Sequence, residues 1–170
     1  MTTTRHIISA LILSLPLLGA ATSRWSLAPG GGLTWHVAKG APAHYDHIEI
    51  SGKKVSTVLR YGVDDEGRFV LDKSLVWPML RTIPNNTHAS LMRRYGWNPL
   101  DAVTVNGMSL TGEQVREISL KGELEVKSDF DKGYYGKYEV IRTFFPSAEL
   151  PALVETYSIV NKLSLIHISE

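Results

Sequence analysis

The chain contains no cysteine, and its positive and negative charges nearly cancel. Without a thiol there is no disulfide, no zinc–thiolate site, no cysteine nucleophile and no lipid-modified cysteine anchor. Lys and Arg number 18 against 17 Asp and Glu. This balance gives no electrostatic reason to expect nucleic acid or an anionic membrane as a partner. P-loop, dinucleotide-binding, serine-hydrolase and zinc-protease motifs are also lacking, so we expect neither a cofactor nor a metal.

What the sequence does contain is the composition of a folded domain. The hydrophobic fraction is 44% and the charged fraction is 21% in 170 residues. These values are typical of a globular chain of one-domain size rather than a disordered one.

The first residues are typical of an export signal. Arg5 gives a basic start, residues 7–20 form an apolar run, and small residues follow up to Ser23. The alternative is a short membrane anchor, but the run is shorter than the ~20 residues of a spanning helix and Pro16 interrupts it. We therefore interpret residues 1–23 as a signal peptide and expect a periplasmic or extracellular protein that is free of the membrane after cleavage.

The remaining chain is predicted to be all-β. Residues 24–45 are interpreted as a lead-in segment, and residues 46–162 as an antiparallel β-sandwich that is incomplete relative to a longer parent protein. Hydrophobic and polar residues alternate over 55–60, 124–127 and 138–145, the period of a strand with one buried face. The last two stretches are expected to pair as a hairpin, and Asn106–Gly107 is a strong signal for another. Residues 69–71 and 75–77 suggest a further strand pair, and only residues 87–95 could form a helical turn.

The last eight residues differ in character from the rest. Residues 163–170 (LSLIHISE) match the translation of a transposase adapter end used to prepare sequencing libraries. The alternative is a genuine apolar strand, which Leu165, Ile166 and Ile168 could form. We interpret the segment as a non-native tail and expect the natural protein to continue beyond Lys162.

Two clusters of possible metal ligands occur in the sequence. His44 and Asp46 would share one face of a strand, while His47 and Glu49 would share the other, so neither half is large enough for a closed site. Residues 64–66, followed by Gly67, are typical of a solvated hairpin turn and lack the ligand spacing of a calcium loop. Both clusters are therefore interpreted as ordinary surface groups.

The segment 77–90 combines an aromatic ring, a guanidinium, amides and an imidazole between prolines. Such groups suit a sugar, whose apolar face stacks on a ring while its hydroxyls form hydrogen bonds. The alternative is that Trp77 fills the core and the two amides cap a turn. The candidate substrate-binding residues are Trp77, Arg81, Asn85, Asn86 and His88.

Residues 138–161 carry a resemblance to a known group. A strand with the pattern Arg-x-x-Phe-Pro-Ser ends at Ser147, and after a short turn a second strand runs to Asn161. This resembles the late strands of the N-terminal β-sandwich in secreted bacterial glycoside hydrolases with a six-hairpin α/α barrel, including the α-L-rhamnosidase-like enzymes. The resemblance implies that the catalytic carboxylates lie in a barrel beyond this chain, so no catalytic residue is assigned here.

The expected function is therefore that of a non-catalytic N-terminal β-sandwich from an exported glycoside hydrolase. Its expected partners are carbohydrate and its own C-terminal catalytic domain, which would cover an apolar patch that contains either Ile141 and Phe145 or Val154 and Val160. Two alternatives stay open: a stand-alone secreted module that binds carbohydrate or another surface, and an accessory domain of a different exported enzyme.

Overall fold

The computed structural model describes residues 23–78, 90–105, 107–131 and 136–162. The predicted signal peptide up to residue 22 and the tail 163–170 lie outside the described residues. In the part that is described, no helix has the length and apolar character needed to cross a membrane.

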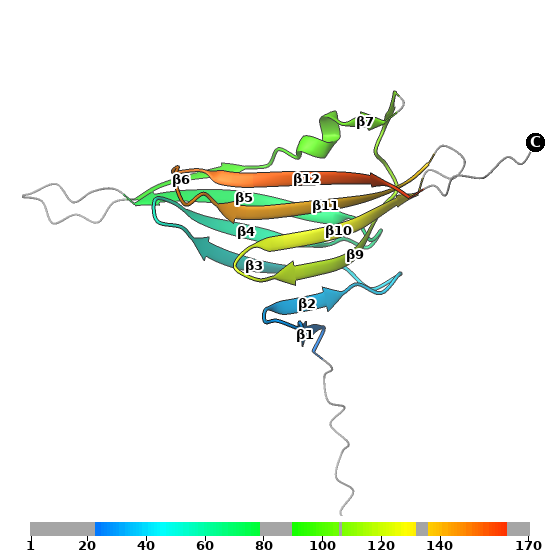
Figure 1. Ribbon diagram of the computed structural model, residues 1–170, viewed down its shortest axis with the longest axis horizontal. Coiled ribbons are helices and arrows are strands. Elements are labelled where there is room, and N and C mark those ends of the chain that lie inside the picture. Colours follow the sequence, from blue (N-terminus) through cyan, green and yellow to red (C-terminus); the bar gives the residue numbers. More distant parts are fainter. Residues whose placement is uncertain (1–22, 79–89, 106, 132–135, 163–170) are drawn as a thin grey trace, which may run out of the picture.

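The fold is all-β, with antiparallel strands arranged as a β-sandwich, which confirms the predicted fold class (Figure 1). The larger sheet has the strand order β1-β2-β9-β10-β11-β12. Its strands are β1 (Trp25–Leu27), β2 (Leu33–His36), β9 (Glu113–Leu120), β10 (Leu124–Asp131), β11 (Lys137–Pro146) and β12 (Leu153–Asn161).

The smaller sheet has the order β3-β4-β5-β6. Its strands are β3 (His44–Ser51), β4 (Ser56–Val63), β5 (Phe69–Pro78) and β6 (Ser90–Tyr95). A short 3-10 helix, η1 (Pro99–Ala102), leads from β6 into a two-stranded hairpin of β7 (Thr104–Val105) and β8 (Met108–Ser109).

Strict alternation of side chains builds the core between the two sheets. On β10, every second residue from Leu124 to Phe130 is buried, Ser128 included, whereas the residues between them lie on the outer face. The smaller sheet supplies Leu59 and Tyr61 on β4 in the same way. Because these strands bury one face and expose the other, apolar side chains gather between the sheets, where they form a larger cluster around Leu59 and Phe144 and a smaller one around Phe130 and Val140.

Two predicted hairpins are confirmed. β10 pairs with β11 along its whole length, from Leu124 opposite Phe144 to Asp131 opposite Lys137. β7 pairs with β8, with Val105 opposite Met108; Gly107, which lies between these strands, has φ 75°, a left-handed conformation that glycine adopts without a steric penalty.

Three local expectations differ from the structure. Residues 90–95, expected to form a helical turn, form strand β6, because pairing with β5 satisfies their backbone groups. Residues 69–78 form one strand rather than two. The lead-in segment 24–45 supplies β1 and β2, and β2 pairs with β9 inside the larger sheet.

Candidate functional site

A groove opens where the edge strand of one sheet meets the edge strand of the other. It lies between β5 and β6 of the smaller sheet and β12 of the larger sheet. These three strands are labelled next to one another in Figure 1. Its volume is about 340 Å³, within the range of small-molecule sites. We call it the aromatic groove; its lining residues are Lys73, Leu75, Trp77, Tyr95, Trp97, Pro151, Ala152, Leu153 and Glu155.

The aromatic side chains of this groove come from β5, from β6 and from the segment after it. Lys73 pairs with Tyr95 across β5 and β6, so Trp77 and Tyr95 project from the same face of the sheet. Trp97 is 67% exposed, an unusual state for the largest side chain. Trp77 is half-buried, and its indole Nε1–H donates to the carbonyl oxygen of Pro151 over 2.7 Å. That bond fixes the ring in the groove wall.

The polar floor of the groove is an ion pair between the two sheets. Lys73 is only 3% exposed, and its ammonium Nζ lies 2.7 Å from Oε1 of Glu155. Nζ also donates to the carbonyl oxygen of Trp97 over 2.8 Å. The hydroxyl of Tyr157 donates to Oε2 of Glu155 over 2.8 Å. Burial raises the pKa of Tyr157, and the carboxylate of Glu155 adds to that rise, so this hydroxyl stays protonated.

The groove can therefore form two kinds of contact with a ligand. An ammonium has three donor hydrogens, and each carboxylate oxygen accepts more than one hydrogen bond. Lys73 and Glu155 thus retain capacity for hydroxyl groups that both donate and accept. The aromatic rings offer flat apolar faces beside this pair.

The structure describes only one of the five predicted substrate-binding residues. Trp77 lines the aromatic groove, while Arg81, Asn85, Asn86 and His88 lie outside the described residues. Binding of a substrate by all five stays a prediction. Lys73, Trp97 and Glu155 were not singled out from the sequence. Lys73 did carry a signal, because it interrupts the inward-facing series of Phe69, Leu71, Leu75 and Trp77.

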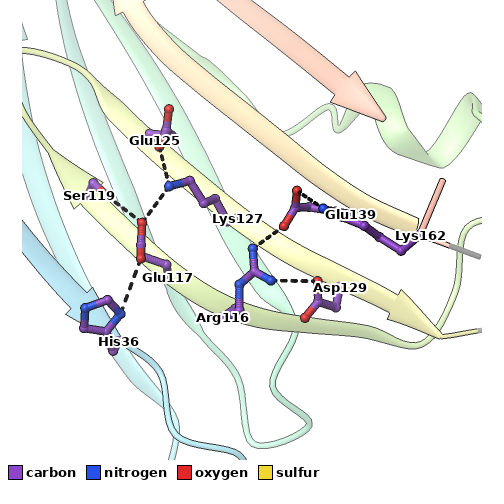
Figure 2. Close-up of polar contacts among 9 residues, drawn as sticks. All are labelled: His36, Arg116, Glu117, Ser119, Glu125, Lys127, Asp129, Glu139 and Lys162. Carbon is purple, nitrogen blue, oxygen red and sulfur yellow. Dashed lines mark hydrogen bonds and ion pairs between the residues drawn. The ribbon is translucent and has the colours of Figure 1, made fainter. Parts of the chain in front are cut away.

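A second polar cluster lies on the outer face of the larger sheet (Figure 2). A β-bulge in β9 creates it: Lys127 pairs with Glu117, but the next residue, Ser128, pairs with Val115. Arg116 is the extra residue, and the bulge directs its side chain outward. There Arg116 contacts Glu139 and, over 3.4 Å, Asp129.

The carboxylates of this cluster are all held by cations. Lys127 Nζ lies 2.8 Å from Glu117 and 3.3 Å from Glu125, and Lys162 Nζ lies 3.0 Å from Glu139. A hydrogen bond from Lys127 holds the pKa of Glu117 below its usual value. A glycosidase general acid needs the opposite shift. The cluster therefore suits cross-strand support better than proton transfer.

The polar residues at the start of β3 behave as the sequence predicted. His44 and Asp46 face inward from the strand, whereas His47 and Glu49 are exposed on the other face. His44 Nε2 lies 3.7 Å from Asp46, which Arg24 also binds over 2.5 Å. Among the described residues, no group of three or more His, Asp or Glu is placed to hold a metal ion.

Compared with known proteins, the chain matches no family model, no curated protein and no solved structure.

Proposed function

We propose that this chain is an exported β-sandwich that binds carbohydrate in the aromatic groove. The observation that carries the proposal is the position of the exposed Trp97 beside the buried pair of Lys73 and Glu155. A sugar has an apolar ring face and hydroxyls that both donate and accept hydrogen bonds. The rings and the ion pair offer complementary surfaces for these two features.

The contribution of each residue follows from its position. Trp97 supplies a stacking surface that is free in the absence of ligand, so its burial by a sugar ring is favourable. Trp77 supplies a wall that its bond to Pro151 already orders, which reduces the entropy lost on binding. Lys73 and Glu155 orient hydroxyl groups.

The test is a titration of the full 170-residue chain with neutral and acidic oligosaccharides, derived from β-glucan, xylan, mannan and pectin, followed by tryptophan fluorescence. At least one oligosaccharide should bind, and Trp97→Ala should weaken that binding about tenfold or more, because stacking on an aromatic ring contributes about 1.4 kcal/mol or more. The matched control is Tyr45→Ala, which removes an exposed aromatic side chain from the outer face of β3. Binding that survives Trp97→Ala, or the absence of binding to any oligosaccharide, would refute the proposal.

We also propose that this β-sandwich accompanies the catalytic domain of a glycoside hydrolase, as the resemblance of residues 138–161 implies. Supporting this, Phe145 pairs with Val154 on the outer face of the larger sheet, and Ile141 and Val160 lie on the same face. On this face the apolar side chains alternate with Thr143, Thr156 and Ser158. A mixed surface of this kind is compatible with contacts between domains of one chain, which are more polar than obligate interfaces. A stand-alone carbohydrate-binding module would use the same groove without this second contact.

Sequencing the intact gene from genomic DNA tests this second part. A reading frame that continues beyond residue 162 into repeated helical hairpins with paired acidic residues would support it. A stop codon close behind that residue would favour the stand-alone module.

A further inference from the structure

Behind the aromatic groove lies a second pocket that the groove's own residues help to form. Its volume is about 210 Å³. Lys73 and Trp97 line both spaces, so the two are neighbours around these side chains. We call the second space the arginine pocket, because Arg142 of β11 lines it together with Phe69, Asn98 and Tyr157.

Arg142 is an unusual residue to find inside a β-sandwich. The residue is 1% exposed, and its guanidinium carbon lies 4.5 Å from the centre of the Phe69 ring. One terminal nitrogen donates to Ser128 over 2.7 Å and also contacts Glu113. The Nε–H is buried without any hydrogen-bond partner. A buried donor without an acceptor is unfavourable, so the protein gains when an acceptor atom reaches it.

Two other side chains that line the pocket, Lys73 and Asn98, also retain donor hydrogens. The ammonium of Lys73 uses two of its hydrogens, on Glu155 and on the carbonyl oxygen of Trp97. The side-chain amide of Asn98 donates to Asp101, which leaves its second hydrogen. Tyr157 already donates its hydroxyl hydrogen to Glu155. The group that best complements these donors has acceptor oxygens and no hydrogen of its own.

Hydrogen-bond strength favours an organic carboxylate over water. Burial lowers the pKa of Arg142 to about 10, which leaves it protonated at neutral pH and deprived of hydration. A carboxylate forms stronger hydrogen bonds to such a guanidinium than a neutral acceptor does. The pocket is also large enough to admit a carboxylate group.

We propose that the arginine pocket receives the carboxylate of a uronate unit, an acidic sugar whose chain continues into the aromatic groove. This inference rests on the proposed carbohydrate binding and gives it a substrate class. The carboxylate would accept from Nε–H of Arg142 and from the third hydrogen of Lys73. The sugar ring would lie beside Trp97, which borders both spaces.

A nitrogen-15 correlation spectrum of the full chain tests the two proposals separately. Arginine Nε–H and tryptophan indole Nε1–H groups both give signals in it, and triple-resonance experiments assign those of Arg142 and Trp97. Glucuronate should shift the Arg142 signal in a saturable way, whereas glucose and the methyl ester of glucuronate should leave it in place. Acetate should bind at least about tenfold more weakly than glucuronate, because it lacks the ring that contacts Trp97.

The outcomes distinguish the proposals. An Arg142 signal that glucuronate leaves unmoved, or that acetate shifts with equal affinity, overturns the uronate inference. If neutral oligosaccharides still shift the Trp97 signal in that case, carbohydrate binding in the groove stands. As a second measurement, Arg142→Lys keeps the charge but removes Nε–H. Provided its near-ultraviolet circular dichroism matches the wild type, it should bind glucuronate about tenfold more weakly; unchanged affinity would also overturn the inference.

Discussion

Lys73 and Glu155 form an ion pair that joins the two sheets of the sandwich, with Nζ of Lys73 lying 2.7 Å from Oε1 of Glu155. The side chain of Lys73 is 4% exposed and that of Glu155 is 19% exposed. An ion pair with so little solvent is costly to break from one side, since the remaining charge loses both its partner and water.

Replacing Lys73 alone should therefore destabilise the fold. We expect Lys73→Met to lower the free energy of unfolding by about 3 kcal/mol, because Glu155 is left without its cation. Urea denaturation followed by circular dichroism measures this. The double variant Lys73→Met/Glu155→Leu should recover most of the loss, and Lys53→Met, on an exposed turn, is the control. A loss below about 1 kcal/mol would show that the pair contributes little.

The stability of the protein should fall in acid partly through Glu139. Hydrogen bonds from Arg116 and then Lys162 hold the pKa of Glu139 below its usual value. The unfolded chain has a glutamate pKa of about 4.3. The contribution of Glu139 is therefore fully present above that pH and is lost as the pH falls through the lower pKa of the folded state.

Urea denaturation midpoints measured from about pH 2 to 7 would reveal this dependence. Glu139→Gln should flatten the acid limb of the curve relative to the wild type. Glu149→Gln, on an exposed turn, should follow the wild-type curve. The assignment fails if the two variants behave alike.

Two glycines should respond in opposite ways to the same substitution. A Cβ atom on Gly62 would lie 2.2 Å from the backbone oxygen of His44, so Gly62→Ala should cost about 1–3 kcal/mol of stability. A Cβ on Gly96 meets no atom within 4 Å. Gly96→Ala should be neutral or should stabilise by up to about 1 kcal/mol, by restricting the unfolded chain. Thermal melting of both variants tests the contrast, and equal shifts would contradict it.

Alkaline conditions should weaken the fold through Tyr61. Burial, followed by the negative charge of Asp46, raises the pKa of Tyr61 to about 12. The unfolded value is about 10, so the neutral phenol favours the folded state below that pH, and this stability is lost as the pH rises through about 12. Tyr61→Phe should reduce the alkaline slope of stability. A near-ultraviolet absorbance titration in which every tyrosine ionises near pH 10 would contradict the assignment.

The fold class could be predicted from the sequence because its signals are local. The alternation from Tyr138 to Phe145 and the Asn106–Gly107 turn signal each involve residues of a single hairpin. Such signals can therefore be recognised in the sequence without knowledge of the three-dimensional structure. Strand β6 could not be predicted, since Ser90–Tyr95 shows no alternation and becomes a strand only through its pairing with β5.

The groove could be predicted only in part. Trp77 stands out as a tryptophan beside a proline. The contact between Glu155 and Lys73, however, joins two different sheets and cannot be inferred from the separation of these residues in the sequence. The outward position of Arg116 likewise depends on a bulge, which shifts the register by one residue.

The order of strands in the larger sheet has a consequence for how fast the protein folds. Leu33 pairs with Leu120, and the whole of the smaller sheet lies between them in the chain. Bringing the two ends of so long a loop together lowers the chain entropy before the contacts between them can stabilise the fold. The hairpins β3–β4 and β4–β5 close short loops, so they can form early, whereas β2 can dock only after β9 has been placed. Folding should therefore be slow, on the milliseconds-to-seconds scale of sandwiches with distant strand partners.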